Sequence, residues 1–472
     1  MLIYLRKIDT KRYGEMDEWM KYLNDSMDDT VESSSITDYH RRILETKVML
    51  PNTYLYSVEK GDEDFGVFSY TIAKLCLIDV DEADSSAEIV LFSIHDDEWN
   101  DEAKVMAVRN LLNKAFHELK LNRLFIKLDK ENSDVGIFES LGFEAMDEKD
   151  DLTVMEIGNR MKILVTGAAG KLGYDVVREL SSRGHIVLGS DIEQDFEMVL
   201  EGTETTVPYS VMDITDSNQV NKIVEEFKPD AIIHCSAWTA VDDAEIEKNR
   251  SAVYDINVKG TENLARACRN CGAKMMYITT DYAFDGSGNI PWDADSKDFA
   301  PLNYYGQTKL DGENAVTINL EKYFVIRTEW AFGKNGHNFV DVLLEAAKHR
   351  KQITVVDDQI GTPTYFYDLS RLLADMIVTD KYGFYNATNS GGYVSRYEYA
   401  KEIFRQAAAL GHEEYSEKNL AVSAVSSAEC GLSKTVRPLN SRLDNSKLVK
   451  AGFEELPDWK DALGRYLKEK EF

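Results

Sequence analysis

The stretch Lys162–Gly173, KILVTGAAGKLG, constrains the fold more than any other part of this 472-residue chain. A short β-branched run is followed by three glycines, Gly167, Gly170 and Gly173, and then by a helical pattern. This order is typical of dinucleotide binding, because glycines permit a sharp turn and bring backbone N–H groups close to a pyrophosphate at a helix N-terminus. Glycine turns also occur as plain connections, so the interpretation needs support from the surrounding sequence.

The segments that follow the glycine turn provide this support. The next apolar run, HIVLGSD, ends on Asp191, near the spacing of about twenty residues at which a carboxylate accepts ribose hydroxyls. Such a carboxylate repels a 2′-phosphate, which predicts NADH preferred over NADPH; the alternative is that Asp191 is a turn residue after a strand. Apolar runs at 230–235 and 274–280 alternate with helical segments. They predict an α/β fold with a doubly wound parallel (Rossmann) sheet and ligands at the carboxyl ends of its strands.

A tyrosine and a lysine four residues apart lie beyond the run at 274–280. On a helix this spacing places the Tyr305 phenol and the Lys309 ammonium on one face. We expect the ammonium to lower the pKa of Tyr305 from about 10, which suits a group that protonates a carbonyl oxygen during hydride transfer. Thr280 would supply a hydroxyl that orients the same oxygen. Of the five pairs with this spacing in the sequence, only this one follows both a glycine turn and a threonine-ended strand.

The composition excludes several kinds of partner and site. A formal net charge of −29 argues against nucleic acid or an anionic membrane as a partner, so a phosphorylated ligand needs local cations. The five cysteines include one CxxC, Cys268 and Cys271, and the histidines form no HxxxH or HExxH. We therefore expect free thiols and no metal site. The sequence has no signal-peptide core or membrane-length apolar run, which predicts a cytoplasmic protein.

Eight motifs in a fixed order carry a resemblance that covers nearly all of residues 161–472. They are VTGAAGKLG, SAWTAVDDAE, INVKGTENLA, TTDYAFDG, YYGQTKLDGE, VIRTEWAFG, DQIGTPT and RPLNSRLD. Together they resemble the extended short-chain dehydrogenases/reductases and, within that group, the dTDP-4-dehydrorhamnose reductases. The resemblance implies that NAD(P)H reduces the 4-keto group of dTDP-4-dehydro-L-rhamnose to give dTDP-L-rhamnose.

The resemblance also implies roles for individual residues. Thr280, Tyr305 and Lys309 would be catalytic. The cofactor-binding residues would be Gly167, Gly170, Lys171, Leu172, Gly173, Asp191, Asp213, Ile214, Ser236, Ala237, Tyr305 and Lys309. The substrate-binding residues would be Trp238, Thr239, Asp281, Tyr282, Arg327, Trp330 and Arg437. The two arginines are the candidates for the nucleotide diphosphate.

Two alternatives to this reductase stay open. One is a cofactor-binding regulatory subunit without catalysis, and the other is a reductase or epimerase that acts on another nucleotide sugar. The complete catalytic set favours an enzyme, because a drifted regulatory protein has no physical reason to retain all three groups. A nucleotide sugar is the expected partner, and a homodimer is the expected assembly.

The domain organisation follows from changes in pattern along the chain. Residues 161–332 would form the Rossmann core, and 333–472 would mainly supply a smaller substrate domain, since FVDVLLEAAKHR and SRYEYAKEIFRQAAAL are amphipathic. Residues 1–158 predict an α+β domain, in which an apolar stripe marks a helix over Asp101–Leu119.

This N-terminal domain resembles the GNAT N-acetyltransferases in its strands EIVLFSI and LNRLFIKL and its FESLGFE ending. Two departures matter for acetyl transfer. The glycine-rich pyrophosphate turn of that family corresponds to Trp99–Lys104, WNDEAK, whose acidic side chains repel phosphate. Phe138 stands where many members place a tyrosine acid. We therefore expect a GNAT-like fold without a working acetyl-CoA site.

Overall fold

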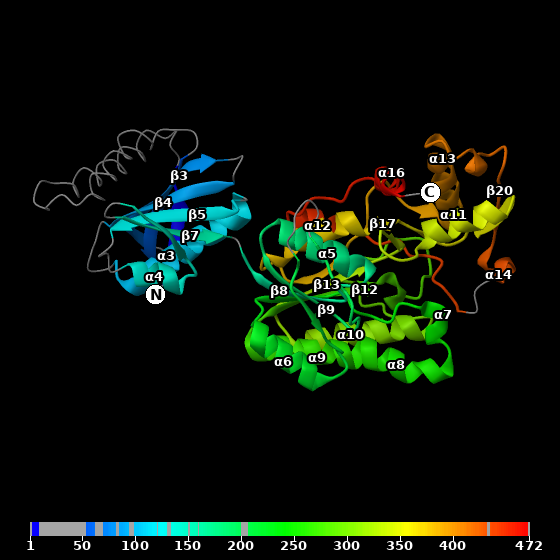
Figure 1. Cartoon of the computed structure of the whole chain (residues 1–472), viewed down its shortest axis with the longest axis horizontal. Coiled ribbons are helices and arrows are strands. Elements are labelled where there is room, and N and C mark those ends of the chain that lie inside the picture. Colours follow the sequence, from blue (N-terminus) through cyan, green and yellow to red (C-terminus); the bar gives the residue numbers. More distant parts are fainter. Residues whose placement is uncertain are drawn as a thin grey trace, which may run out of the picture. The chain divides into compact units, whose positions relative to one another are not determined.

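The computed structural model describes residues 2–8, 53–61, 69–81, 85–93, 99–119, 121–129, 134–149, 152–158, 160–199, 206–431 and 435–470. The chain divides into two compact units, Met1–Arg160 and Met161–Phe472 (Figure 1). Each unit has its own hydrophobic core.

The described strands of the first unit form one sheet in the order β1-β2-β3-β4-β5-β7-β6. Neighbours are antiparallel except β4 and β5, which are parallel, as the long connection between them through helix α3 requires. The strands are β1 (Leu2–Lys7), β2 (Tyr54–Gly61), β3 (Ser69–Asp81), β4 (Ser86–Ser93), β5 (Arg123–Asp129), β6 (Glu144–Lys149) and β7 (Leu152–Gly158). The helices are α3 (Asp101–Asn113), its π-helical continuation η1 (Lys114–Glu118) and α4 (Val135–Ser140).

Helix α3 begins where its sequence provides a cap, since the Asn100 side chain accepts from the N–H of Ala103 at 3.0 Å. The predicted apolar stripe is confirmed, because Ala103, Ala107 and Leu111 are buried in the core beside the sheet. The α-helix ends at Asn113 and continues as the π-turn, rather than running regularly to Leu119. The GNAT-like resemblance of this unit stays a prediction.

The second unit is organised around a parallel sheet in the order β10-β9-β8-β11-β12-β13-β18. Its strands are β8 (Lys162–Thr166), β9 (Ile186–Asp191), β10 (Tyr209–Val211), β11 (Ala231–His234), β12 (Lys274–Thr280), β13 (Tyr323–Thr328) and β18 (Gly383–Asn386). The chain runs outward from β8 to β10 and then resumes on the other side of β8 with β11. The predicted doubly wound α/β fold is confirmed, and the switch in direction between β8 and β11 is where such sheets bind ligands.

Helices cover both faces of this sheet (Figure 1). Helices α5 (Lys171–Ser182) and α12 (Phe366–Ile377) lie on one face, and α6 (Ser217–Phe227), α9 (Thr261–Cys271) and α10 (Tyr304–Asn319) lie on the other. Alternate strand residues serve the two cores: Ile163 and Val165 pack with α5 and α12, whereas Leu164 packs with α6 and α9. Burial on both faces explains why these strands are continuously apolar.

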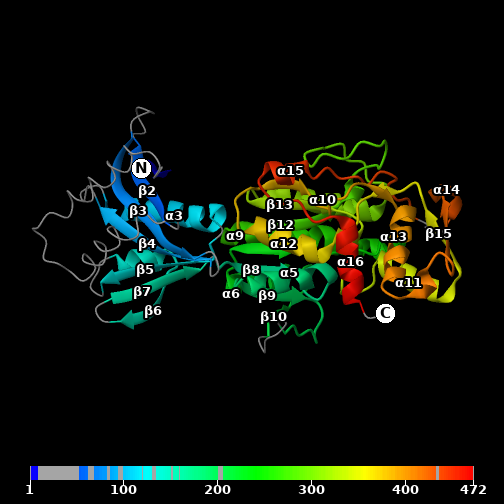
Figure 2. The same cartoon turned by 90° about the horizontal axis from the view of Figure 1, so that it is seen from above.

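The C-terminal elements form a further core around Val340, Tyr399 and Trp459. Helices α11 (Phe339–His349), α13 (Arg396–Ala409) and α16 (Trp459–Glu469) gather at one end of the sheet (Figure 2). The remaining strands are β14 (Ala331–Phe332), β15 (Gln352–Val356), β16 (Ile360–Gly361), β17 (Thr364–Tyr365), β19 (Val394–Ser395) and β20 (Ala421–Val425). The remaining helices are α7 (Val241–Ala244), α8 (Arg250–Tyr254), α14 (Ser427–Cys430) and α15 (Ser446–Lys450), with short turns at 247–249, 255–260, 281–283 and 413–415. In the described part of the chain, no helix combines the length and apolarity needed to cross a membrane.

Candidate active site

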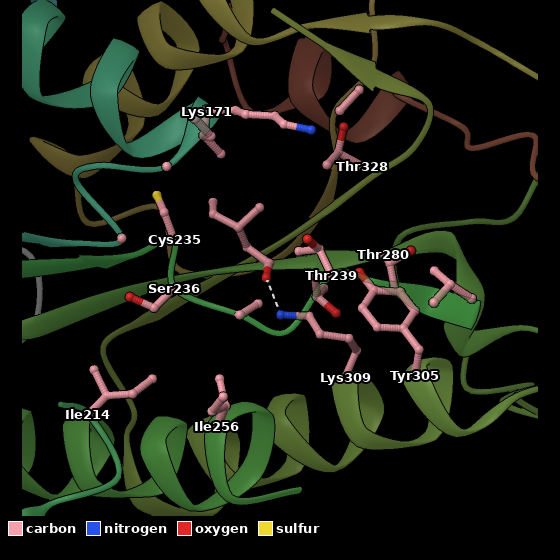
Figure 3. A pocket seen from close by; sticks show the side chains of 18 of the residues that line it. Lys171, Ile214, Cys235, Ser236, Thr239, Ile256, Thr280, Tyr305, Lys309 and Thr328 are labelled. Carbon is pink, nitrogen blue, oxygen red and sulfur yellow. Dashed lines mark hydrogen bonds between the residues drawn. The ribbon is translucent and has the colours of Figure 1, made fainter. Parts of the chain in front are cut away.

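A cavity of about 790 Å³ lies at the carboxyl ends of β8, β11 and β12. Its lining joins the glycine turn, Asp191 and the Tyr305–Lys309 pair in one space. Figure 3 shows Ile214, Ser236 and Lys171 around one part of this cavity and Thr280 and Tyr305 around another. Two residues predicted for the cofactor from motif matches, Asp213 and Ala237, also line it.

The glycine turn has the geometry that a diphosphate needs. Gly167 has a φ of +73°, and a Cβ on it would lie 2.6 Å from the backbone nitrogen of Ser236. A Cβ on Gly173 would lie 1.9 Å from the Gly167 carbonyl oxygen, so this position must be glycine for α5 to start so close to the turn. Gly170 is the N-cap of α5 and has no side chain to accept from the first backbone N–H groups of the helix. These N–H groups are therefore available to an anion. Leu172 of the same helix lines the cavity.

Asp191 is held at the end of β9 by backbone donors. Its carboxylate accepts from the N–H of Ile192 at 2.7 Å and from that of Ala169, within the glycine turn, at 3.2 Å. The side chain is partly exposed and lines the cavity. A carboxylate in this place suits the hydroxyls of a ribose whose diphosphate rests on the turn. The residues present therefore fit a nicotinamide dinucleotide.

Lys171 follows the turn directly and lines the cavity (Figure 3). Its ammonium donates to the carbonyl oxygen of His337, and partial burial lowers its pKa. Asp341 opposes this shift because its carboxylate favours the charged amine. Lys171 thus supplies the cation that was expected beside the glycine turn while linking α5 to the segment before α11.

Thr280, Tyr305 and Lys309 meet as the sequence predicted (Figure 3). Tyr305 lies in the first turn of α10, where Asn303 caps the helix by accepting from the N–H of Gly306 at 2.8 Å. Thr280, at the end of β12, lines the cavity beside Tyr305 (Figure 3). One helical turn further, the Lys309 ammonium donates to the carbonyl of Ile278 at 2.8 Å.

The ionisation of this group differs from the expectation. The prediction that Lys309 lowers the pKa of Tyr305 is wrong: burial raises the pKa of Tyr305, and the Tyr282 and Asp281 side chains raise it further. Burial also lowers the pKa of Lys309 to about 7. Desolvation of the buried phenol dominates its pKa, whereas the Lys309 ammonium donates to the Ile278 carbonyl. Tyr305 is consequently a neutral phenol that holds its proton at pH 7.

The end of the cavity where we expect the sugar, called the sugar end below, contains Asp281, Tyr282 and Trp330. Asp281 is buried and accepts from the hydroxyls of Ser441 and Thr280. Burial raises its pKa to about 6. The Tyr282 ring meets the Tyr305 ring edge-on at 5.8 Å. Trp330 has a φ of +46°, a strained conformation for a bulky residue and one that concentrates at functional sites.

Arg327 does not serve the cavity, and its prediction as a diphosphate ligand is wrong. It is 1% exposed, and its guanidinium donates to both oxygens of Glu313, at 3.1 and 2.7 Å, and to the Ala294 carbonyl at 2.9 Å. Arg437 pairs with Asp242 at 2.9 Å and interacts electrostatically with Tyr282. It does not line the cavity.

Two more residues were predicted to bind the substrate, and only one of them lines the cavity. Thr239 lines the cavity, whereas the Trp238 ring lies outside the lining and its N–H donates to the Ala240 carbonyl at 3.1 Å. Among the charged residues of the lining, sequence reasoning missed Asp255, Glu329 and Arg396. The sequence carried a hint for Arg396, because it directly follows the helix-capping Ser395, but nothing in the pattern relates that helix start to Trp330.

Comparisons with known proteins concern the second unit. A sequence model described as the RmlD substrate binding domain matches residues 161–472. The dTDP-4-dehydrorhamnose reductase of Aggregatibacter actinomycetemcomitans is 35% identical over 311 residues, which cover 64% of this chain and 97% of the relative. The spore coat polysaccharide biosynthesis protein SpsK of Bacillus subtilis is 32% identical over 309 residues, or 66% and 98% of the two chains. The crystal structure of dTDP-4-dehydrorhamnose reductase from Bacillus anthracis in complex with NADP is 36% identical, with a TM-score of 0.57, over 66% of this chain and 100% of that one.

Proposed function

The chain belongs to the RmlD substrate binding domain family, and from this premise we propose that it is an NAD(P)H-dependent reductase of a nucleotide sugar. The substrate is dTDP-4-dehydro-L-rhamnose, and reduction of its 4-keto group yields dTDP-L-rhamnose. The observation that carries the proposal is the convergence of Thr280, Tyr305 and Lys309 in the same cavity as the glycine turn. The names of relatives that this chain matches along nearly their whole length support the choice of substrate.

The side chains divide the work of the reduction. A bound nicotinamide supplies the hydride to the carbonyl carbon. Tyr305 donates its phenolic proton to the carbonyl oxygen, because burial keeps the phenol neutral. Thr280, which lines the cavity beside Tyr305, orients the same oxygen. Lys309, in its charged form, stabilises the phenolate left on Tyr305.

Burial shields the catalytic side chains from water. Lys309 and Thr280 are 3% and 7% exposed, and the Tyr282 and Trp330 side chains line the sugar end. A water-poor site strengthens the electrostatic interactions among these groups and orients both reactants. Trp330, between β13 and β14, and Arg396, at the start of α13, both line this end of the cavity.

We assign the cofactor preference to Asp191. Its carboxylate, held by the Ala169 and Ile192 amides, would accept the ribose hydroxyls of NADH and repel the 2′-phosphate of NADPH. The Bacillus anthracis relative was crystallised with NADP, so the preference has to be measured for this chain. A homodimer and a cytoplasmic location stay predictions, as does the absence of a working acetyl-CoA site in the first unit.

The test is to follow NADH absorbance after adding freshly prepared dTDP-4-dehydro-L-rhamnose to the full chain. We expect NADH to be consumed in step with formation of dTDP-L-rhamnose. Binding of NADH without its oxidation, over a range of pH and salt, would contradict the proposal and favour a regulatory protein. Oxidation with a different nucleotide sugar but not with this one would keep the reductase and correct its substrate.

A further inference from the structure

Arg396 stands at the sugar end of the cavity with its guanidinium uncommitted. It is the first residue of α13, is partly buried and lines the cavity. Its guanidinium lies 3.8 Å from the centre of the Trp330 ring and 4.9 Å from that of Phe339. Within the described part of the chain it makes no ion pair, and the hydrogen bond found for Arg396 is that of its backbone N–H to the Gln359 carbonyl, at 3.2 Å.

Other arginines of this unit are held by carboxylates. Arg327 is paired with Glu313, Arg465 with Asp368 at 2.7 Å, and Arg183 with Asp375 at 2.6 Å. The other two cations that line the cavity, Lys171 and Lys309, each donate to a backbone carbonyl, whereas no hydrogen bond or ion pair is found for the Arg396 guanidinium in the described part of the chain. The five N–H donors of an arginine side chain are then available to a ligand.

The acids nearest to Arg396 are committed to other donors. Asp281 accepts from Ser441 and Thr280, and Glu329 accepts from the N–H of Thr362 at 2.9 Å. Both carboxyl groups are buried, and burial raises their pKa values, to about 6 for Asp281 and well above the ordinary range for Glu329. They influence Arg396 through space but do not neutralise it by direct contact.

The ligands that the proposed function requires explain such a cation. The cofactor and the nucleotide sugar each carry a diphosphate. Among the described residues, the basic side chains that line the cavity are Lys171, Lys309 and Arg396. Lys171 stands beside the glycine turn and Lys309 beside the reacting hydroxyls, which leaves Arg396 for the second diphosphate.

We propose that Arg396 binds the diphosphate of the nucleotide sugar, as a positioning residue carried on the face of Trp330. This assignment rests on the proposed function, because Arg396 would recognise the diphosphate of the nucleotide sugar named there. The planar guanidinium donates to two phosphate oxygens at once, and the flat contact with Trp330 fixes its orientation before the ligand arrives. Arg327, the earlier candidate for this role, is replaced by Arg396.

The experiment compares Arg396→Gln and Arg396→Lys in the full chain with Arg371→Gln as a matched control. Arg371 also lies over an aromatic ring, 6.0 Å from the centre of Tyr367, but it is exposed and outside the cavity lining. We expect Arg396→Gln to raise KM for the nucleotide sugar roughly 10- to 100-fold, the range for loss of a charge-assisted bidentate contact, while KM for NADH stays unchanged. Arg396→Lys should recover part of the loss, and Arg371→Gln should behave as wild type.

Ligand binding separates this proposal from the proposed function. With NAD⁺ at saturation, calorimetry measures the affinity for dTDP and for thymidine, which lacks the diphosphate. Arg396→Gln should weaken dTDP binding by the same factor as it raises KM and leave thymidine binding unchanged. Equal dTDP affinity in wild type and Arg396→Gln, with the cavity otherwise intact, would overturn the proposal even if the reductase is active. Weakened dTDP binding in a chain that reduces no dTDP-sugar would support Arg396 and refute the reductase.

Discussion

Replacing Arg327 with leucine should destabilise the second unit by about 3–5 kcal/mol, the cost of leaving one member of a buried ion pair without its partner. Arg327 and Glu313 are 1% and 2% exposed, and the substitution removes two hydrogen bonds to the Glu313 carboxylate and one to the Ala294 carbonyl. The guanidinium also lies 5.1 Å from the centre of the Phe284 ring, which stacks on Trp292 at 4.5 Å. Urea unfolding followed by tryptophan fluorescence therefore has a reporter close to the pair.

The control is Arg405→Leu, which removes an arginine bonded to both oxygens of Glu402 at 2.7 Å but at an exposed position. That variant should lose less than about 1 kcal/mol, because water screens the pair. The double variant Arg327→Leu/Glu313→Leu should be more stable than Arg327→Leu, since it leaves no unpaired carboxylate. The structural role of Arg327 would be refuted if Arg327→Leu unfolded like the Arg405 control and raised KM for the nucleotide sugar instead.

Three further perturbations test other parts of the site. Folded Lys309 has a pKa lowered by burial to about 7 against 10.5, so between these values the unfolded chain binds the extra proton. The free energy of unfolding of wild type relative to Lys309→Met should rise with pH over this window, and a flat difference would show that Lys309 is not desolvated. Gly173→Ala places a Cβ 1.9 Å from the Gly167 carbonyl oxygen. This variant should lower the free energy of unfolding by about 1–3 kcal/mol and abolish tight NADH binding. The control is Gly136→Ala, which should do neither, because a Cβ there has no atom of the described structure within 4 Å. Asp191→Asn should lower the NADH-to-NADPH ratio of kcat/KM at least about tenfold, since 1.4 kcal/mol of relieved repulsion suffices for that factor; an unchanged ratio would remove Asp191 from cofactor selection.

The sequence carried enough information to place the glycine turn, Asp191 and the Tyr305–Lys309 pair, because each depends on local geometry. A glycine with positive φ, an acid at a strand end and two side chains one helical turn apart all leave a pattern within a few residues. The apolar strands likewise predicted the doubly wound sheet, since burial on both faces removes polar alternation.

Burial and long-range pairing decide what the sequence could not predict. Arg327 lies in a motif and carries the right charge for a diphosphate, but its partner Glu313 comes from a different element, α10, and both are enclosed by the core. Arg396 belongs to a helix that reads as ordinary and amphipathic, while the Trp330 ring beneath it is 66 residues earlier in the chain. The predicted direction of the Tyr305 pKa shift was wrong for a similar reason. Residue spacing identifies a neighbouring charge but does not show that burial removes water from the phenol.

The most direct test of the reductase is the turnover of Tyr305→Phe beside wild type, with dTDP-4-dehydro-L-rhamnose and NADH. The substitution removes the phenolic proton and leaves the ring that meets Tyr282 in place. We predict that wild type oxidises NADH and that Tyr305→Phe binds NADH with nearly the same affinity but turns over roughly 10²-fold more slowly or less, the loss expected for a general acid. Equal turnover in the two proteins would contradict the role of Tyr305, and absence of NADH oxidation by wild type would contradict the reductase itself.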